Sequence, residues 1–134
     1  MTQNQVSNEV MTQVKIKRVY EPEEKSDGYR VLVDKLWPRG IRKENLHYDL
    51  WAKDIAPSTP LRQWYHHEEE GHWNEFRMKY IKELENSSAV KDFIDKVKDQ
   101  KVITLLYASK NAAENHALVL QNFLAKPLVV ITSR

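Results

Sequence analysis

Four side chains of this sequence could together bind a small anion and act on it. Arg39 and Arg62 carry planar guanidinium groups, which form paired hydrogen bonds with a phosphate or a carboxylate. Histidine changes charge near neutral pH, so His116 could serve as a catalytic acid or base. Asp34 is the second catalytic candidate, because it could orient a base or a sugar hydroxyl. A purely basic binding surface would not require this mixture of side chains.

Three further residues are expected to contact the ligand. Asn115 directly precedes His116 and could donate or accept a hydrogen bond. Tyr107 ends a predicted strand, and Ser58 begins a predicted helix. Ser58 is more easily explained as a helix cap than as a nucleophile, because the sequence names no base that would activate it.

The same side chains also have structural interpretations. Asp34 could cap a turn through backbone N–H groups. Arg39 could be a solvated turn residue, and Arg62 could lie over Trp64. His116 stands among apolar helix positions, as a structural histidine would. A functional interpretation therefore requires that the fold brings these residues together.

Hydrophobic periodicity predicts a single α/β domain over residues 14–134. Strands are expected over 14–20, 29–34, 101–108 and 128–132, forming a small, mostly parallel sheet of about four strands flanked by helices. Segment 41–57 fits either a short helix or an irregular path. Residues 1–13 are polar and aperiodic and are expected to form a disordered tail, in which Met11 could be a second start site.

Helices are expected at four places. Ser58 or Thr59 could cap the first, with Pro60 at its first position. The stripe of apolar residues in 72–85 predicts the second, and the third follows one of the two serines at 87 and 88. Asn111 and Glu114 have the spacing of a capping box and would begin the fourth.

The expected topology places the candidate site at the carboxyl ends of the strands, where open α/β sheets bind ligands. Asp34 follows the second strand, and Tyr107 ends the central one. Helix N-termini after Ser58 and near Asn115 would add backbone N–H groups that favour anions.

The segment 34–40, DKLWPRG, is expected to form one edge of that site. Leu36, Trp37 and Pro38 would anchor it in the core, and Gly40 would let it bend. Asp34 and Arg39 are the members of this segment that would face the cleft, whereas Lys35 is expected to tolerate replacement.

Composition excludes several classes of protein. The 134 residues include no cysteine, so disulfides and thiolate chemistry are excluded, and only 3 glycines, too few for a Gly-rich phosphate loop. The histidines at 66, 67 and 72 lack a metal-site pattern and are interpreted as a solvated loop. We expect no metal and no cofactor. Without an apolar run of ~20 residues or a secretory signal, the chain is expected to be soluble and cytoplasmic, with no membrane partner.

Four sequence blocks resemble the YeaO-like family of small uncharacterised proteins. They are "DGYRVLVDKLWPRG" at 27–40, "APSTPLRQWY" at 56–65, the aromatic pattern at 73–84, and "VITLLYASK" with "NHALVL" at 102–120. The resemblance extends from about residue 14 to residue 124. It implies a domain of unknown function with no assigned reaction or cofactor, and its polar motif positions coincide with the candidate site.

Three functions remain open from the sequence. The first is binding or turnover of a small phosphate- or carboxylate-bearing ligand. The second is a non-catalytic nucleic-acid or nucleotide module, less favoured because the net charge is only +2, although basic residues concentrate in the first third. The third is a protein-interaction domain. The oligomeric state does not follow from the sequence.

Overall fold

The computed structural model describes residues 12–67 and 72–132 and shows the predicted α/β fold. The strands are β1 (Gln13–Arg18), β2 (Tyr29–Leu32), β3 (Leu50–Trp51) and β4 (Val102–Tyr107). They form one parallel sheet in the order β1-β4-β2-β3. The helices are α1 (Thr59–His67), α2 (Trp73–Glu85), α3 (Ser88–Val97) and α4 (His116–Thr132).

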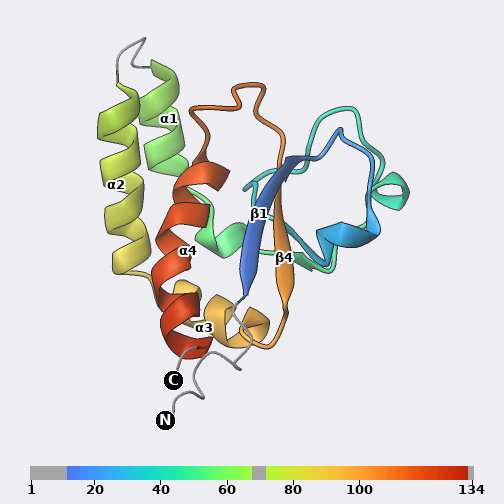
Figure 1. Cartoon of the computed structure of the whole chain (residues 1–134). Helices are drawn as coiled ribbons and strands as arrows, with labels where there is room; N and C mark the ends of the chain where they lie inside the picture. Colours follow the sequence, from blue (N-terminus) through green and yellow to red (C-terminus); the bar gives the residue numbers. More distant parts are fainter. Residues whose placement is uncertain (1–11, 68–71, 133–134) are drawn as a thin grey trace.

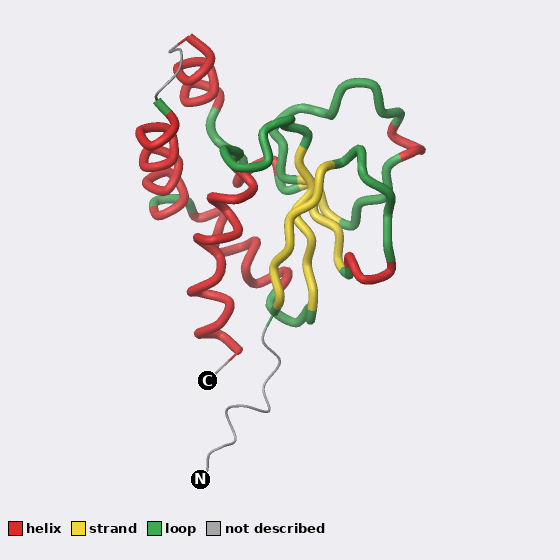
Figure 2. The backbone as a smooth tube through the Cα atoms, turned by 45° about the horizontal axis from the view of Figure 1, so that its top comes forward, coloured by secondary structure: helices red, strands yellow, loops and turns green. Residues whose placement is uncertain are grey.

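The helices lie on one side of the sheet and irregular segments on the other (Figures 1 and 2). Alternation along the strands explains this division. Val31 and Leu105 belong to the larger core under the helices, whereas their neighbours Leu32 and Leu106 belong to a smaller core under the irregular segments. Strand β4 is buried on both faces, as its apolar run predicts.

The predicted strand at 128–132 is wrong, because α4 continues to Thr132. A five-residue apolar run has too few positions to separate the period of a strand from that of a helix. The fourth strand is instead β3, inside the segment for which a short helix or an irregular path was expected. It pairs with β2 through Val31–Leu50 and Leu32–Trp51. Two short 3-10 helices, Lys43–Asn45 and Lys53–Ile55, flank it.

The start of α4 also differs from the prediction. Asn111 does not open the helix, because its Oδ1 accepts hydrogen bonds from the backbone N–H groups of Ala113 and Glu114, at 2.9 Å each, and closes a turn. Asn115 is the cap, accepting from Leu118 N at 2.8 Å. The helix therefore begins four residues later than the capping-box spacing predicts, with its cap at Asn115 in place of Asn111.

The other three helices are confirmed at their expected places. Ser58 caps α1 by accepting a hydrogen bond from Leu61 N at 3.2 Å, which makes Pro60 the second helical residue and not the first. Ser87 caps α3 through Ala89 N at 3.2 Å. At the chain start, Gln13 already belongs to β1; the rest of the predicted tail, apart from residue 12, lies outside the described residues, as does Met11.

The described residues contain no helix long and apolar enough to cross a membrane. Within the same residues, no group of three or more histidine, aspartate or glutamate side chains is placed to hold a metal ion.

Candidate functional site

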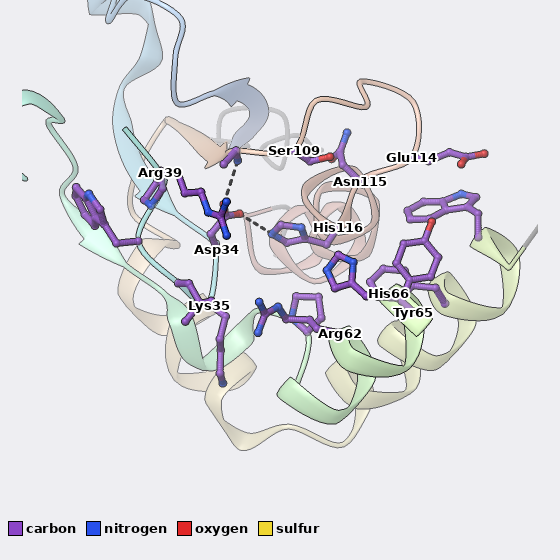
Figure 3. A pocket seen from close by; sticks show the side chains of 17 residues that line it. Asp34, Lys35, Arg39, Arg62, Tyr65, His66, Ser109, Glu114, Asn115 and His116 are labelled. Atoms are coloured by element: carbon purple, nitrogen blue, oxygen red, sulfur yellow. Dashed lines mark hydrogen bonds and ion pairs between the residues drawn. The ribbon is translucent and has the colours of Figure 1, made fainter. Parts of the chain in front are cut away.

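A cleft of about 380 Å³ opens at the carboxyl ends of β2 and β4 (Figure 3). Its walls come from segment 34–39 after β2, segment 108–116 after β4, and helices α1 and α2. Five of the seven predicted site residues line it, namely Asp34, Arg39, Arg62, Asn115 and His116. Ser58 and Tyr107 do not line it.

Asp34 and His116 form a pair at the base of the cleft. The Asp34 Oδ2 atom accepts the backbone N–H of Ala108 at 3.0 Å, which fixes the carboxylate. His116 Nε2 lies 3.0 Å from Asp34 Oδ1 and 3.0 Å from the carbonyl oxygen of Val33. Because both neighbours are acceptors, Nε2 must carry a proton. In the neutral ring Nδ1 is then an acceptor, and this carboxylate–imidazole pair can orient the ring for proton transfer or ligand binding.

Arg39 and Arg62 reach the cleft from two different elements (Figure 3). Arg39 is exposed in the turn after β2, where Tyr20 Oη donates a hydrogen bond to its carbonyl oxygen at 2.9 Å. Arg62 is half-buried on α1. Across residues 12–67 and 72–132, neither guanidinium has a carboxylate within ion-pair distance or a side-chain hydrogen bond. Both charges therefore remain available to an external anion.

Asn115 lines the cleft but uses its amide for structure. Its Nδ2 donates to the Asn111 carbonyl at 2.9 Å, and its Oδ1 caps α4. The residue is only 3% exposed. Its predicted hydrogen bond to a ligand would use the second N–H of Nδ2 or the second lone pair of Oδ1. The cap also positions His116, the next residue.

Ser58 and Tyr107 are held in other parts of the structure. The Ser58 hydroxyl donates to Glu83 while it caps α1, which supports its interpretation as a cap. Tyr107 is buried in the larger core. Burial, followed by the nearby charge of Glu21, raises the pKa of its hydroxyl.

The DKLWPRG segment is anchored mainly through its indole. Trp37 Nε1 donates to the Ile41 carbonyl at 2.6 Å, and the ring packs edge-on against Trp51 at 5.5 Å between centroids. Pro38 is buried, and Gly40 has φ +79°. The expected anchoring role of Leu36 is wrong, because this side chain is 62% exposed. Leu36 instead lines the cleft, between Lys35 and Trp37.

Arg18 holds the backbone segment after β4, which forms one wall of the cleft. Its Nε donates to the Ser109 carbonyl at 2.8 Å and its Nη2 to the Ala108 carbonyl at 3.1 Å. The same Ala108 donates its N–H to Asp34. The backbone after β4 is thus held by a guanidinium on one side and a carboxylate on the other.

The sequence did not predict that several other residues line the cleft. The interpretation of His66 and His67 as part of a solvated loop is wrong, because both belong to the last turn of α1. His66 lines the cleft one turn after Arg62, and the i, i+4 spacing of this pair was the available signal. Tyr65, Trp73 and Phe76 also line the cleft, although their periodicity predicts core packing alone.

The fold and the cleft define a small single-domain α/β protein with a polar cleft at the carboxyl ends of parallel strands. The chain belongs to the DUF488-N3i family, described as the inactive DUF488-N3 subclade, whose profile matches residues 13–131. The expected relationship to YeaO-like proteins is confirmed by the relatives that follow.

Three proteins described as uncharacterised are similar to this chain. The chain is 46% identical over 111 residues to the uncharacterised protein YeaO of Escherichia coli, covering 83% of this chain and 96% of that protein. It is 43% identical over 113 residues to an uncharacterised protein of Mycobacterium tuberculosis, covering 84% and 94% respectively. A protein of Mycobacterium bovis is similar to the same extent, 43% over 113 residues. No solved structure gives a significant match.

Proposed function

We propose that this protein binds a small phosphate- or carboxylate-bearing anion in the cleft, between Arg39 and Arg62. The observation that carries the proposal is the pair of guanidinium groups that share one cleft without a carboxylate partner among the described residues. A guanidinium pairs with a carboxylate or phosphate through charge-assisted hydrogen bonds, which are stronger than neutral ones. His116 Nδ1, an acceptor in the neutral ring, would accept a hydrogen bond from a ligand hydroxyl or a protonated phosphate oxygen, with Asp34 holding the ring in place.

Binding without turnover is the form of this function that we favour. The family to which the chain belongs is described as an inactive subclade. Acid–base roles for His116 and Asp34 remain a prediction, to be tested by incubating the protein with phosphate esters and measuring released phosphate.

A nucleic-acid surface in the first third of the chain has less support. Lys17 and Arg30 pair with the buried Asp27, with Lys17 Nζ 2.8 Å from Oδ1. Lys15 Nζ donates to the Ser26 carbonyl at 2.8 Å, and Arg18 holds the loop after β4. These internal contacts leave fewer cations free to follow a phosphate backbone.

Replacing either cleft arginine by glutamine is expected to weaken the binding of methyl phosphate. Losing one charge-assisted hydrogen bond costs about 1.5–3 kcal/mol of binding free energy. This raises the dissociation constant roughly 10–100-fold. Isothermal titration calorimetry on Arg39→Gln and Arg62→Gln measures this loss. Their melting temperatures should stay near that of the wild type, since neither side chain has a charged partner among residues 12–67 and 72–132.

Arg42→Gln is the matched control, because Arg42 is exposed and does not line the cleft. It should bind methyl phosphate as the wild type does. Equal losses in all three variants would indicate general charge attraction and would rule out a site built by the two cleft arginines.

A further inference from the structure

The cleft has an aromatic wall as well as a cationic one. Tyr65 on α1 and Trp73 and Phe76 on α2 line the same space as Arg39 and Arg62. In Figure 3 Tyr65 lies on one side of the cleft and Arg39 and Lys35 lie on the other, with Arg62 and His116 between them.

The aromatic wall is rigid and partly open. The Tyr65 ring centroid lies 4.4 Å from that of Phe76 and 6.3 Å from that of Trp73, and the Trp73 and Phe76 rings stack at 5.5 Å. Phe76 is buried, whereas Tyr65 and Trp73 are half-buried and leave part of their surface in the cleft. Such preordered aromatic surface favours a planar group, because no side-chain freedom is lost when a ring packs against it.

A carboxylate lies at the end of the cleft that the aromatic side chains line. Glu114 lines the cleft from the segment before α4 and is exposed. In Figure 3 Glu114 and Tyr65 lie on the same side of the cleft. Burial, and after it the negative charge of Glu114, raises the pKa of the Tyr65 hydroxyl. The cleft thus has cations at one end and an acceptor beside the aromatic rings at the other.

We infer that the ligand joins its anionic group to an aromatic ring, as an aryl phosphate or a nucleoside monophosphate does. The anion lies against Arg39 and Arg62, the ring packs on Tyr65 and Trp73, and Glu114 accepts a hydrogen bond from a ring amino group. The inference rests on the proposed function, because it assigns the rest of the ligand whose anion the arginines hold. A volume of about 380 Å³ suits such a molecule, since small-ligand sites measure roughly 300–1,000 Å³.

Two probes of equal charge test the inference. Phenyl phosphate should bind more tightly than methyl phosphate by roughly 5–100-fold, the effect of one ring packing on aromatic side chains. Calorimetry gives both dissociation constants. Tyr65→Leu should reduce this preference several-fold and leave the affinity for methyl phosphate unchanged, whereas Tyr65→Phe should retain the preference.

Tyr29→Leu is the matched control, because Tyr29 is also half-buried but begins β2, at the opposite end of that strand from Asp34. It should leave the preference for phenyl phosphate intact. If the two probes bind equally to the wild type, the aromatic assignment is wrong while the anion site stands. If neither probe binds, the proposed function itself fails.

Nucleotide probes separate a free ligand from the end of a nucleic acid. Adenosine monophosphate should bind more tightly than phenyl phosphate, and Glu114→Gln should reduce that gain. A 5′-phosphorylated tetranucleotide that binds more tightly than adenosine monophosphate would overturn the small-molecule form of the inference.

Discussion

Replacing Asp27 by asparagine is expected to lower the free energy of unfolding by about 3–5 kcal/mol, the usual cost of breaking a buried ion pair. The Asp27 side chain is 1% exposed. Its carboxylate forms ion pairs with Arg30 Nη1 and Lys17 Nζ and accepts a hydrogen bond from the backbone N–H of Glu24. An asparagine there would direct an amide N–H₂ group at the cations, take the carboxylate away from Arg30, and leave Lys17 with only the exposed Glu24 among the described residues. Urea denaturation of Asp27→Asn measures the loss.

Glu24→Gln is the control for this variant. Glu24 also contacts Lys17, at 2.9 Å, but its side chain is 66% exposed. An exposed pair of this kind contributes about 0–1 kcal/mol. Equal destabilisation by the two substitutions would mean that burial of the Asp27 cluster is not what stabilises this part of the fold.

The effect of Asp27→Asn should depend on pH. Burial alone would raise the pKa of this carboxyl, but hydrogen bonds from Lys17, from the Glu24 backbone and from Arg30 outweigh it and hold the pKa below its usual range. A lowered folded-state pKa means that the stabilisation is fully present above pH ~4, where the unfolded carboxyl is ionised. It is lost as pH falls through the lower folded-state pKa, so wild type and variant should converge in acid.

Gly28→Ala is expected to destabilise the protein by roughly 2–5 kcal/mol. Gly28 joins the Asp27 turn to β2 with φ +65°, which costs a residue with a side chain about 1–2 kcal/mol. A Cβ there would also lie 2.5 Å from the carbonyl oxygen of Val102, a backbone atom of β4. Relieving that overlap requires β2 and β4 to shift, for about 1–3 kcal/mol more.

Gly40→Ala isolates the conformational part of this cost. Gly40 has φ +79°, but a Cβ there would meet nothing within 4 Å. Its replacement should cost only about 1–2 kcal/mol. Thermal and urea denaturation measure the stability of both alanine variants. Equal stability of the two variants would refute the explanation of the Gly28 effect by close approach to β4.

The strand-end rule predicted the candidate site because the positions it uses are set locally. The segment after β2 must carry Asp34, and the start of α4 must carry His116, once the strands are identified. The carboxyl ends of parallel strands then bring them together, and the structure places His116 Nε2 3.0 Å from Asp34 Oδ1. Errors of several residues in helix boundaries did not disturb this result.

Long-range contacts explain what the sequence could not predict. Lys17 and Arg30 belong to the basic first third of the chain, yet both contact Asp27. The Asp27 carbonyl accepts a hydrogen bond from Thr104, 77 residues away. No local pattern reports such contacts. The two-residue strand β3 is similarly defined by its pairing with β2, since two residues carry no periodicity.

The aromatic lining was missed for a different reason. Tyr65 and Trp73 have core spacing and do pack against the core, but each also contributes surface to the cleft. Periodicity assigns a residue to one face and cannot show that it borders two environments.

The most direct test of anion binding in the cleft is an NMR titration of the ¹⁵N-labelled protein with methyl phosphate. We predict saturable shifts of the Arg39 and Arg62 side-chain Nε–H signals and of the Ser109 and His116 backbone amides. In Arg62→Gln, the dissociation constant obtained from the remaining signals should rise by roughly 10–100-fold. Shifts confined to the lysines of β1, or no saturable shift at millimolar ligand, would contradict the assignment of this cleft as an anion site.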